Sequence, residues 1–296
     1  MSILITTEAT ADFPESLSRD DIKIIPMGYT VNGIGYDGIT EKLTPHEFYE
    51  AVAQAKTASD LPQTSQVTAF VAEEFFSKYL EEGYDIIHLA LSSHLSGTIE
   101  QEKMAAKACL EKYPDRKVTV IDSLSASFGQ GLMAYYASLK NQQGVSYEDL
   151  VNYIENDLKL NINHLFAIDD LNHLCRTGRA TKNEAFLGTA LHIKPVLYIP
   201  NDGSLIPYTK VISQKKAIKT LIETMQKNAV KPGDDILVGV GAADAPEDRA
   251  FLKKLVEDLG YKTVEFDVGP VIGTHVGKGM IVVIYLGSNR EDILKK

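Results

Sequence analysis

The residues with the clearest chemical potential lie where a buried apolar run ends in hydroxyl side chains and a glycine. Residues 84–91 (YDIIHLAL) predict a buried strand, residues 92–98 (SSHLSGT) follow it, and residues 99–113 predict a helix. The first backbone N–H groups of a helix lack intrahelical partners, and the helix dipole places partial positive charge at the same end. The sequence therefore predicts an anion-binding turn within residues 92–98.

Two further segments are too polar to be simple connections. Residues 61–66 (LPQTSQ) contain Thr64 and precede a predicted helix, so a helix N-cap is the alternative explanation. Residues 122–131 (DSLSASFGQG) contain Ser127, and their small side chains could equally serve the close packing of a helix on a sheet.

Two glycine-containing segments add charged and titratable side chains. Residues 174–179 carry Arg176 and Arg179 around a glycine, and two guanidinium groups could clamp a carboxylate or phosphate; exposed surface arginines are the alternative. Residues 269–279 (GPVIGTHVGKG) predict a rigid loop between two strands that presents His275 as a site residue, although a single histidine is more often structural.

Several catalytic templates do not occur in the sequence. Residues 277–279 lack the spacing and hydroxyl of a phosphate-binding loop, and no Gly-x-Ser-x-Gly elbow makes Ser96 a hydrolase nucleophile. The other histidines show no metal-ligand spacing: His88, His94, His164, His173 and His192. The remaining donors, including Thr64 and His275, suit holding an anion better than breaking a bond. The sequence therefore predicts no catalytic residue and no metal site.

Composition restricts the class of protein. The 296 residues are 44% hydrophobic and 24% charged, which is typical of a soluble globular protein. A net charge of −10 argues against nucleic-acid binding, which requires a basic face. No apolar run approaches the ~18–20 residues that span a bilayer, and the N-terminus has no secretory signature. Because Cys109 and Cys175 are far apart, we expect a reduced, cytoplasmic protein.

Alternating strands and helices must position these segments. Up to residue 140 the alternation predicts a mostly parallel sheet with helices on both faces. Asn32 and Gly33 predict a hairpin, and a capping box at Thr44 predicts a helix to about residue 56. The helix predicted over residues 68–82 has one apolar side, formed by Phe70, Val71, Phe75, Tyr79 and Leu80.

The pattern changes beyond residue 160. Residues 201–203 (NDG) predict a turn that pairs residues 195–199 with residues 205–211 as antiparallel strands. Further strands are predicted at residues 165–168, 236–240, 263–268 and 281–286. We therefore predict two α/β domains, residues 1–160 with a mostly parallel sheet and residues 161–296 with a mixed or antiparallel sheet.

Together these segments resemble the DegV family, whose lipid-loaded members serve as the fatty-acid-binding subunits of a bacterial fatty acid kinase. The resemblance covers nearly the whole chain and begins at residues 5–12 (ITTEATAD), which are similar to the family's Thr-Asp-Ser-Thr-Ala-Asp opening. The other similar motifs follow in order at residues 61–66, 92–98, 122–123, 176–179, 194–195 and 269–279.

The resemblance implies one fatty acid buried in the cleft between the two domains. It assigns the carboxylate to Thr64, Ser96, Gly97 and His275. Arg176 matches a cleft arginine, and Arg179 matches a more exposed arginine used toward the kinase. Supporting positions in the cleft are expected at Thr98, Ser127 and Thr274. The acyl tunnel is expected in the second domain around Phe186, Leu187 and Leu191.

The function implied is that of a cytoplasmic lipid-binding protein without catalysis or cofactor of its own. It would take a long-chain fatty acid from the membrane surface, in a transient contact, and present the carboxylate to a separate fatty acid kinase for conversion to an acyl-phosphate. The alternative is a phosphocarrier or a dihydroxyacetone-kinase-like enzyme, with His275 as the reactive residue and residues 96–98 as a phosphate cradle.

Three segments depart from the family pattern. Glu8 and Ala9 replace an Asp-Ser pair, and Lys278 stands where proline is common. Residues 212–214 (ISQ) replace an arginine-rich run that is associated with docking the kinase.

Overall fold

The computed structural model describes residues 2–38, 40–55, 57, 60–180 and 193–295. Within these ranges the first sheet has the order β2-β1-β6-β7, and all its neighbouring strands are parallel. Its strands are β1 (Ser2–Glu8), β2 (Ile22–Ile25), β6 (Tyr84–Ala90) and β7 (Val118–Asp122). The central strands β1 and β6 are buried along almost their whole length, as expected for a parallel sheet covered on both faces. The predicted parallel sheet is confirmed.

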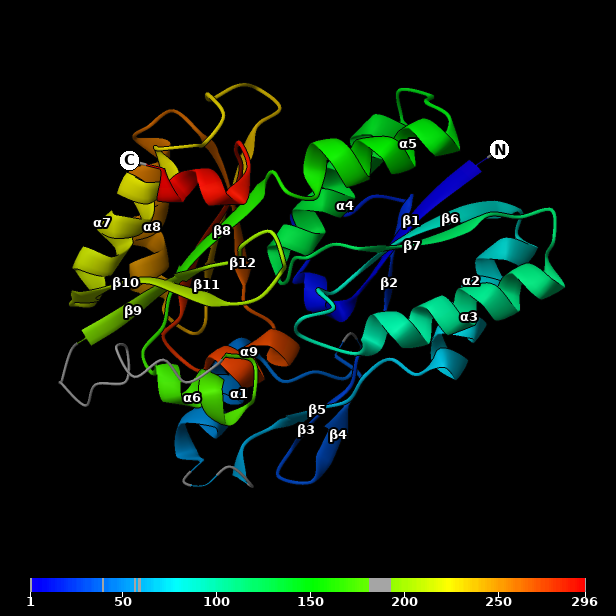
Figure 1. Cartoon of the computed structure of the whole chain (residues 1–296). Coiled ribbons are helices and arrows are strands. Elements are labelled where there is room, and N and C mark those ends of the chain that lie inside the picture. The colour runs from blue at the N-terminus through cyan, green and yellow to red at the C-terminus, as the bar shows by residue number, and fades with distance from the viewer. Residues whose placement is uncertain (1, 39, 56, 58–59, 181–192, 296) are drawn as a thin grey trace.

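Helices cover both faces of this sheet. Successive strand residues point to opposite faces, and Ile86 packs in the cluster around Phe76, whereas Ile87 packs in the cluster around Phe128. The helices α2 (Ala69–Glu81) and α3 (Thr98–Lys112) run side by side, and α4 (Phe128–Asn141) lies between the first sheet and the second (Figure 1). The segment at residues 122–131 thus leads into the helix that joins the two halves.

The predicted apolar side of the helix at residues 68–82 is wrong at its N-terminal end. Helix α2 buries Ala72, Phe76 and Leu80, which lie one turn apart, while Phe70 is 68% exposed and Val71 39% exposed. Because each residue turns the helix by about 100°, Phe70 and Val71 fall outside the stripe that faces the core.

In the described part of the chain, the second sheet has six strands in the order β10-β9-β8-β13-β11-β12. They are β8 (Ile162–Ala167), β9 (Ile193–Tyr198), β10 (Ile206–Ile212), β11 (Leu237–Ala242), β12 (Lys262–Asp267) and β13 (Ile281–Leu286). Among the described strands of this sheet only β11 and β12 pair in parallel, so the predicted mixed sheet and the β9–β10 hairpin are confirmed. Helices α7 (Gln214–Met225) and α8 (Pro246–Glu257) cover its outer face, and α4 covers the inner one (Figure 1).

The two-unit α/β architecture is confirmed, because the strands of the parallel sheet end at Asp122 and those of the mixed sheet begin at Ile162. Between them, α5 (Tyr147–Tyr153) continues into one π-helical turn (Ile154–Leu158). One apolar cluster contains Ile5 of β1 and Phe166 of β8, so the halves share a core. The domain boundary at residue 160 stays a prediction.

A small antiparallel sheet, β4-β3-β5, lies beside this core. The hairpin of β3 (Tyr29–Val31) and β4 (Ile34–Tyr36) turns at Asn32 and Gly33, both with positive φ, as predicted. The two-residue strand β5 (Gln63–Thr64), which the sequence analysis did not anticipate, pairs with β3 and places Thr64 opposite Tyr29.

Short helices adjoin this sheet. The predicted capping box of Thr44 and Glu47 begins α1 (Pro45–Gln54). The loop predicted at residues 269–279 is wrong in its central part, which forms α9 (Pro270–Val276), beginning with proline at its first position. Helix α9 packs against α1 and α6 (Leu171–Arg176; Figure 1). No helix within the described ranges is long and apolar enough to span a bilayer.

Candidate functional site

A mostly apolar cavity is lined by segments from both halves of the chain. It encloses about 720 Å³ of space between protein atoms, including the part open to solvent. Its apolar lining includes Leu91 and Leu95 from the first half and Phe166, Ile199 and Val282 from the second. Its polar lining consists of Thr64, Ser96, Ser127, His164, Arg179 and His275. The proposed carboxylate residues Thr64, Ser96 and His275 therefore meet in one cavity.

His275 and Thr64 are in direct contact. The Thr64 hydroxyl lies 3.2 Å from His275 Nε2, and β5 holds Thr64 there through its pairing with β3. Burial, with the nearby Arg179 and His173, lowers the pKa of His275 to about 3. The imidazole is therefore neutral near pH 7 and has one N–H donor. Its buried Nδ1 has no hydrogen-bond partner among the described residues, so the ring keeps polar capacity for a ligand.

The turn before α3 brings the second donor group. Ser96 Oγ accepts a hydrogen bond from the Thr98 N–H at 3.2 Å and lies 2.9 Å from the Thr98 hydroxyl. Gly97 occupies the N-cap position of α3, where a Cβ atom would come within 3.1 Å of the Gln66 side chain. Glycine thus lets the segment at residues 61–66 approach the turn, and two segments singled out in the sequence meet.

The structure places the two arginines differently from the family correspondence. Arg179, expected to be exposed toward a partner, lines the cavity and donates from Nε to the Leu95 carbonyl at 3.3 Å. Arg176, expected in the cleft, is not among the lining residues; its side chain is 52% exposed and pairs with Asp170 at 3.4 Å. Of the two, Arg179 is the cation beside the polar end of the cavity.

Ser127 and Thr274, both expected to support the cleft, lie in different places. Ser127 lines the cavity and donates its hydroxyl hydrogen bond to Asp12, which also accepts from the Gly269 N–H at 2.9 Å. Asp12 thus ties α4 to the start of α9, and burial raises its pKa to about 7. Thr274 lies outside the lining; its carbonyl accepts from His173 Nε2 at 2.8 Å, which fixes α9 against α6.

The acyl tunnel expected in the second domain falls largely on residues that the structure does not describe. Phe186, Leu187 and Leu191, expected to line the acyl tunnel, lie outside the described residues. The described apolar lining includes residues on strands of the mixed sheet, Phe166 of β8 and Val282 and Ile284 of β13. Strand β13 is apolar along its whole length, so its sequence does not mark which alternate residues face the cavity.

The chain matches the family model described as "Uncharacterised protein, DegV family" over residues 2–287. This chain belongs to the DegV family. A DegV domain-containing protein of Clostridium perfringens is 35% identical over 292 residues, covering 97% of this chain and 98% of that protein. A fatty acid-binding protein of Thermotoga maritima is 32% identical over 289 residues, covering 95% of this chain and 96% of that protein.

Solved structures of the DegV family share the fold. A DegV family protein from Thermus thermophilus, whose structure is described for fatty acid binding, aligns with a TM-score of 0.84 at 27% identity. The alignment covers 97% of this chain and 100% of that chain. Members of the DegV family similar to this chain along its whole length thus bind fatty acids.

The departures from the usual DegV pattern have structural partners. Lys278, where proline is common, lies 2.9 Å from Asp244 and also pairs with Glu50 of α1. In the segment that replaces the arginine-rich run, Ser213 caps α7 by accepting from the Lys216 N–H, while Ile212 is 73% exposed. The third departure, at Glu8, is buried in the parallel sheet.

Proposed function

We propose that this DegV family protein binds one long-chain fatty acid, with its carboxylate at Thr64, Ser96, Gly97 and His275 and its acyl chain in the apolar cavity. The observation that carries the proposal is the meeting of Thr64, Ser96 and His275 on the wall of one mostly apolar cavity. The fatty-acid-binding relatives from two organisms support the ligand class.

The physical chemistry of the cavity fits a ligand with one anionic end. A carboxylate leaving water needs several hydrogen bonds, each worth roughly 1.5–3 kcal/mol when the acceptor is charged. The hydroxyls of Thr64 and Ser96 and the neutral imidazole of His275 supply donors, while Arg179 supplies positive charge. The acyl chain dominates the affinity, because each buried methylene contributes about 0.8 kcal/mol.

We infer that the protein presents this carboxylate to a separate fatty acid kinase in the cytoplasm, after taking the lipid from the membrane surface. The kinase supplies ATP and metal for acyl-phosphate formation. Within the described residues, His275 is hydrogen-bonded to Thr64 and has no carboxylate against its ring to orient it as a reactive base. This arrangement favours binding over the phosphocarrier alternative.

Fatty-acid affinity of the Ser96→Ala/His275→Ala double variant tests the proposal. We expect palmitate and oleate to bind about 100–10,000-fold more weakly, because two hydrogen bonds to a charged group are removed. Ser93→Ala is the matched control, since Ser93 is an exposed serine of the same turn and lies outside the cavity. Unchanged affinity in the double variant would refute the assignment, and a covalent phosphoryl or dihydroxyacetone adduct on His275 would favour the enzyme.

A further inference from the structure

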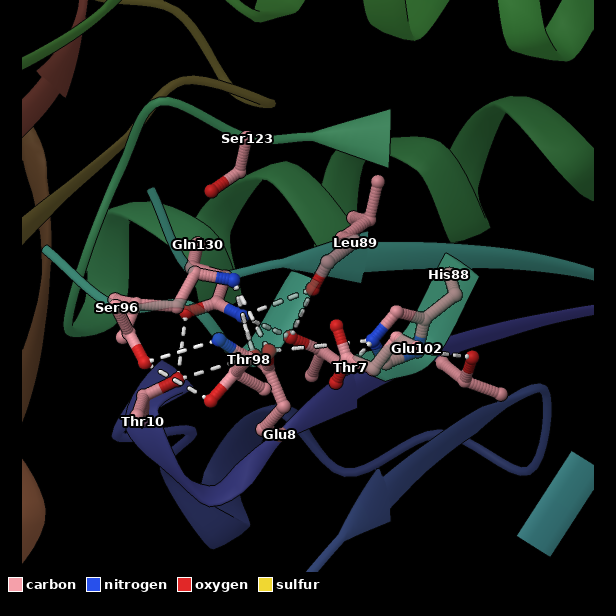
Figure 2. Close-up of polar contacts among 12 residues, drawn as sticks. Thr7, Glu8, Thr10, His88, Leu89, Ser96, Thr98, Glu102, Ser123 and Gln130 are labelled. Carbon is pink, nitrogen blue, oxygen red and sulfur yellow. Dashed lines mark hydrogen bonds and ion pairs between the residues drawn. The ribbon is translucent and has the colours of Figure 1, made fainter. Parts of the chain in front are cut away.

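Three buried side chains converge inside the parallel sheet, beneath the turn that leads into α3. They are Glu8 at the end of β1, His88 on β6 and Glu102 on α3, all 0% exposed (Figure 2). His88 Nε2 lies 3.0 Å from Glu102 Oε1 and 4.0 Å from Glu8 Oε1. One nitrogen and two carboxylate oxygens thus face one another, each contributed by a different element.

In this triad of Glu8, His88 and Glu102, several buried polar atoms have no hydrogen-bond partner among the described residues outside it. Apart from their approach to one another, His88 Nε2 and both carboxylate oxygens of Glu102 have no hydrogen-bond partner in the described part of the chain. In the same part, neither Glu8 nor Glu102 forms an ion pair with a lysine or arginine. Two buried carboxylates of this kind are costly unless a cation or protons compensate them.

Surrounding residues hold two of the three side chains in place. His88 Nδ1 lies 2.8 Å from the Thr6 hydroxyl, which leaves Nε2 facing the carboxylates. Glu8 accepts from the Leu91 N–H at 3.1 Å. It also accepts from the Thr10 hydroxyl and from the Gln130 amide (Figure 2). A histidine fixed through its second nitrogen and a carboxylate fixed by outer hydrogen bonds are typical of metal ligands in proteins.

We propose that Glu8, His88 and Glu102 bind a divalent transition-metal ion such as Zn²⁺ or Mn²⁺. Imidazole nitrogen and carboxylate oxygen are ligands of such ions, at about 2.0–2.2 Å for zinc, so two ligands of one ion lie at most about 4.4 Å apart. The separations of 3.0 and 4.0 Å satisfy that limit. A dication also neutralises the two carboxylates.

The ion has a structural role next to the carboxylate turn. Glu102 lies one helical turn beyond Thr98, and the other end of the turn, at Leu91, donates its N–H to Glu8. The ion therefore joins β1, β6 and α3 at both ends of residues 91–98. Ligand spacing in the sequence gave no indication of it, because the three residues come from distant segments.

Metal content of the full-length protein tests this inference. Because the triad is buried, we expect an ion to enter only during folding, so the protein is refolded with Zn²⁺ or Mn²⁺ and then desalted. Its metal content is measured by inductively coupled plasma mass spectrometry, and its Tm by thermal unfolding. We expect one ion per chain and a raised Tm. Glu102→Gln and His88→Gln should lower metal affinity at least about tenfold and abolish the Tm increase.

Two control variants separate this site from other carboxylates. Glu100→Gln changes an exposed glutamate of the same helix, and Glu50→Gln changes the separate group of His46, Glu50 and Asp244, of which Glu50 and Asp244 are partly buried; both variants should retain the ion. Glu102→Gln removes a buried charge without changing shape, so we expect it to fold, as checked by circular dichroism. A folded wild type that retains neither ion and shows no Tm increase would overturn the proposal. So would equal retention by Glu102→Gln.

Discussion

At the scale of single residues, burial sets the protonation state of His275 in the cavity. His275 is held neutral by burial beside Arg179, so it acts as a hydrogen-bond donor rather than as a cation. The sequence singled out His275, Thr64 and Ser96 as candidate donors because they lie in polar segments next to predicted strands and helices. The family resemblance placed Arg176 in the cleft and Arg179 at the surface, whereas Arg179 lines the cavity and Arg176 ends α6 with an exposed side chain.

The two arginines provide a matched pair of variants. Arg179→Ala should weaken palmitate binding about tenfold, because it removes a charge beside the cavity's polar end and a contact to Leu95. Arg176→Ala should leave affinity within about twofold, since its exposed pair with Asp170 contributes little. Isothermal titration calorimetry measures both. Equal effects of the two substitutions would show that Arg179 has no special place at the ligand.

Asp12 gives a prediction on pH dependence. Its pKa is raised from 3.8 to about 7 by burial, so the folded protein retains a proton that the unfolded chain releases. This contribution to the free energy of unfolding is present near pH 4 and is lost as the pH rises toward about 7. Each pKa unit corresponds to about 1.4 kcal/mol, so the effect is of the order of a few kcal/mol.

Asp12→Asn should therefore lose less stability than the wild type between pH 5 and pH 8 (roughly the window below and above the raised pKa). Asparagine keeps the acceptor for the Gly269 N–H and cannot ionise. Urea unfolding at the two pH values measures the difference. An equal decrease in the free energy of unfolding of both proteins would show that ionising Asp12 does not destabilise the folded state.

At the scale of elements, α4 links the two sheets, and its glycines explain how closely it packs. A Cβ atom on Gly129 would lie 1.8 Å from His164 Nε2 and 2.7 Å from Ser125 Oγ. The sequence left open whether residues 122–131 serve packing or binding. The structure shows packing at Gly129 and cavity lining at Ser127.

Gly129→Ala should destabilise the protein by about 1–3 kcal/mol, because the added methyl group forces α4 away from β8. In an unconstrained helix the same change stabilises by up to about 1 kcal/mol. Gly35→Ala is the control, since Gly35 has negative φ and nothing within 4 Å of an added Cβ atom. Chemical denaturation provides the measurement, and a stabilised Gly129→Ala would contradict the packing described for α4.

The elements that the sequence did not predict are those that depend on distant partners. The long strands and helices have strong local patterns and were predicted. Strand β5 has only two residues and exists through pairing with β3, and α9 is a seven-residue helix held by His173 and by neighbouring helices. The exposed side of α2 was mispredicted because Phe70 and Val71 are apolar without facing the core.

At the scale of the whole molecule, the proposed ligand site depends on both halves of the chain. Ser96 follows a strand of the parallel sheet, His275 precedes a strand of the mixed sheet, and Thr64 belongs to the small third sheet. The order of motifs along the chain predicted this convergence only through the family resemblance. The distances between the motifs could not be predicted without the folded structure. The same holds for the buried triad of Glu8, His88 and Glu102.

The central claim is that the cavity holds a fatty acid, and native mass spectrometry of protein purified from a bacterial host without added lipid tests it most directly. We predict an adduct of fatty-acid mass that is lost on denaturation and is identified as a long-chain acid after extraction. A protein that carries no adduct, and that remains at its bare mass after incubation with palmitate and oleate, would contradict the proposed function.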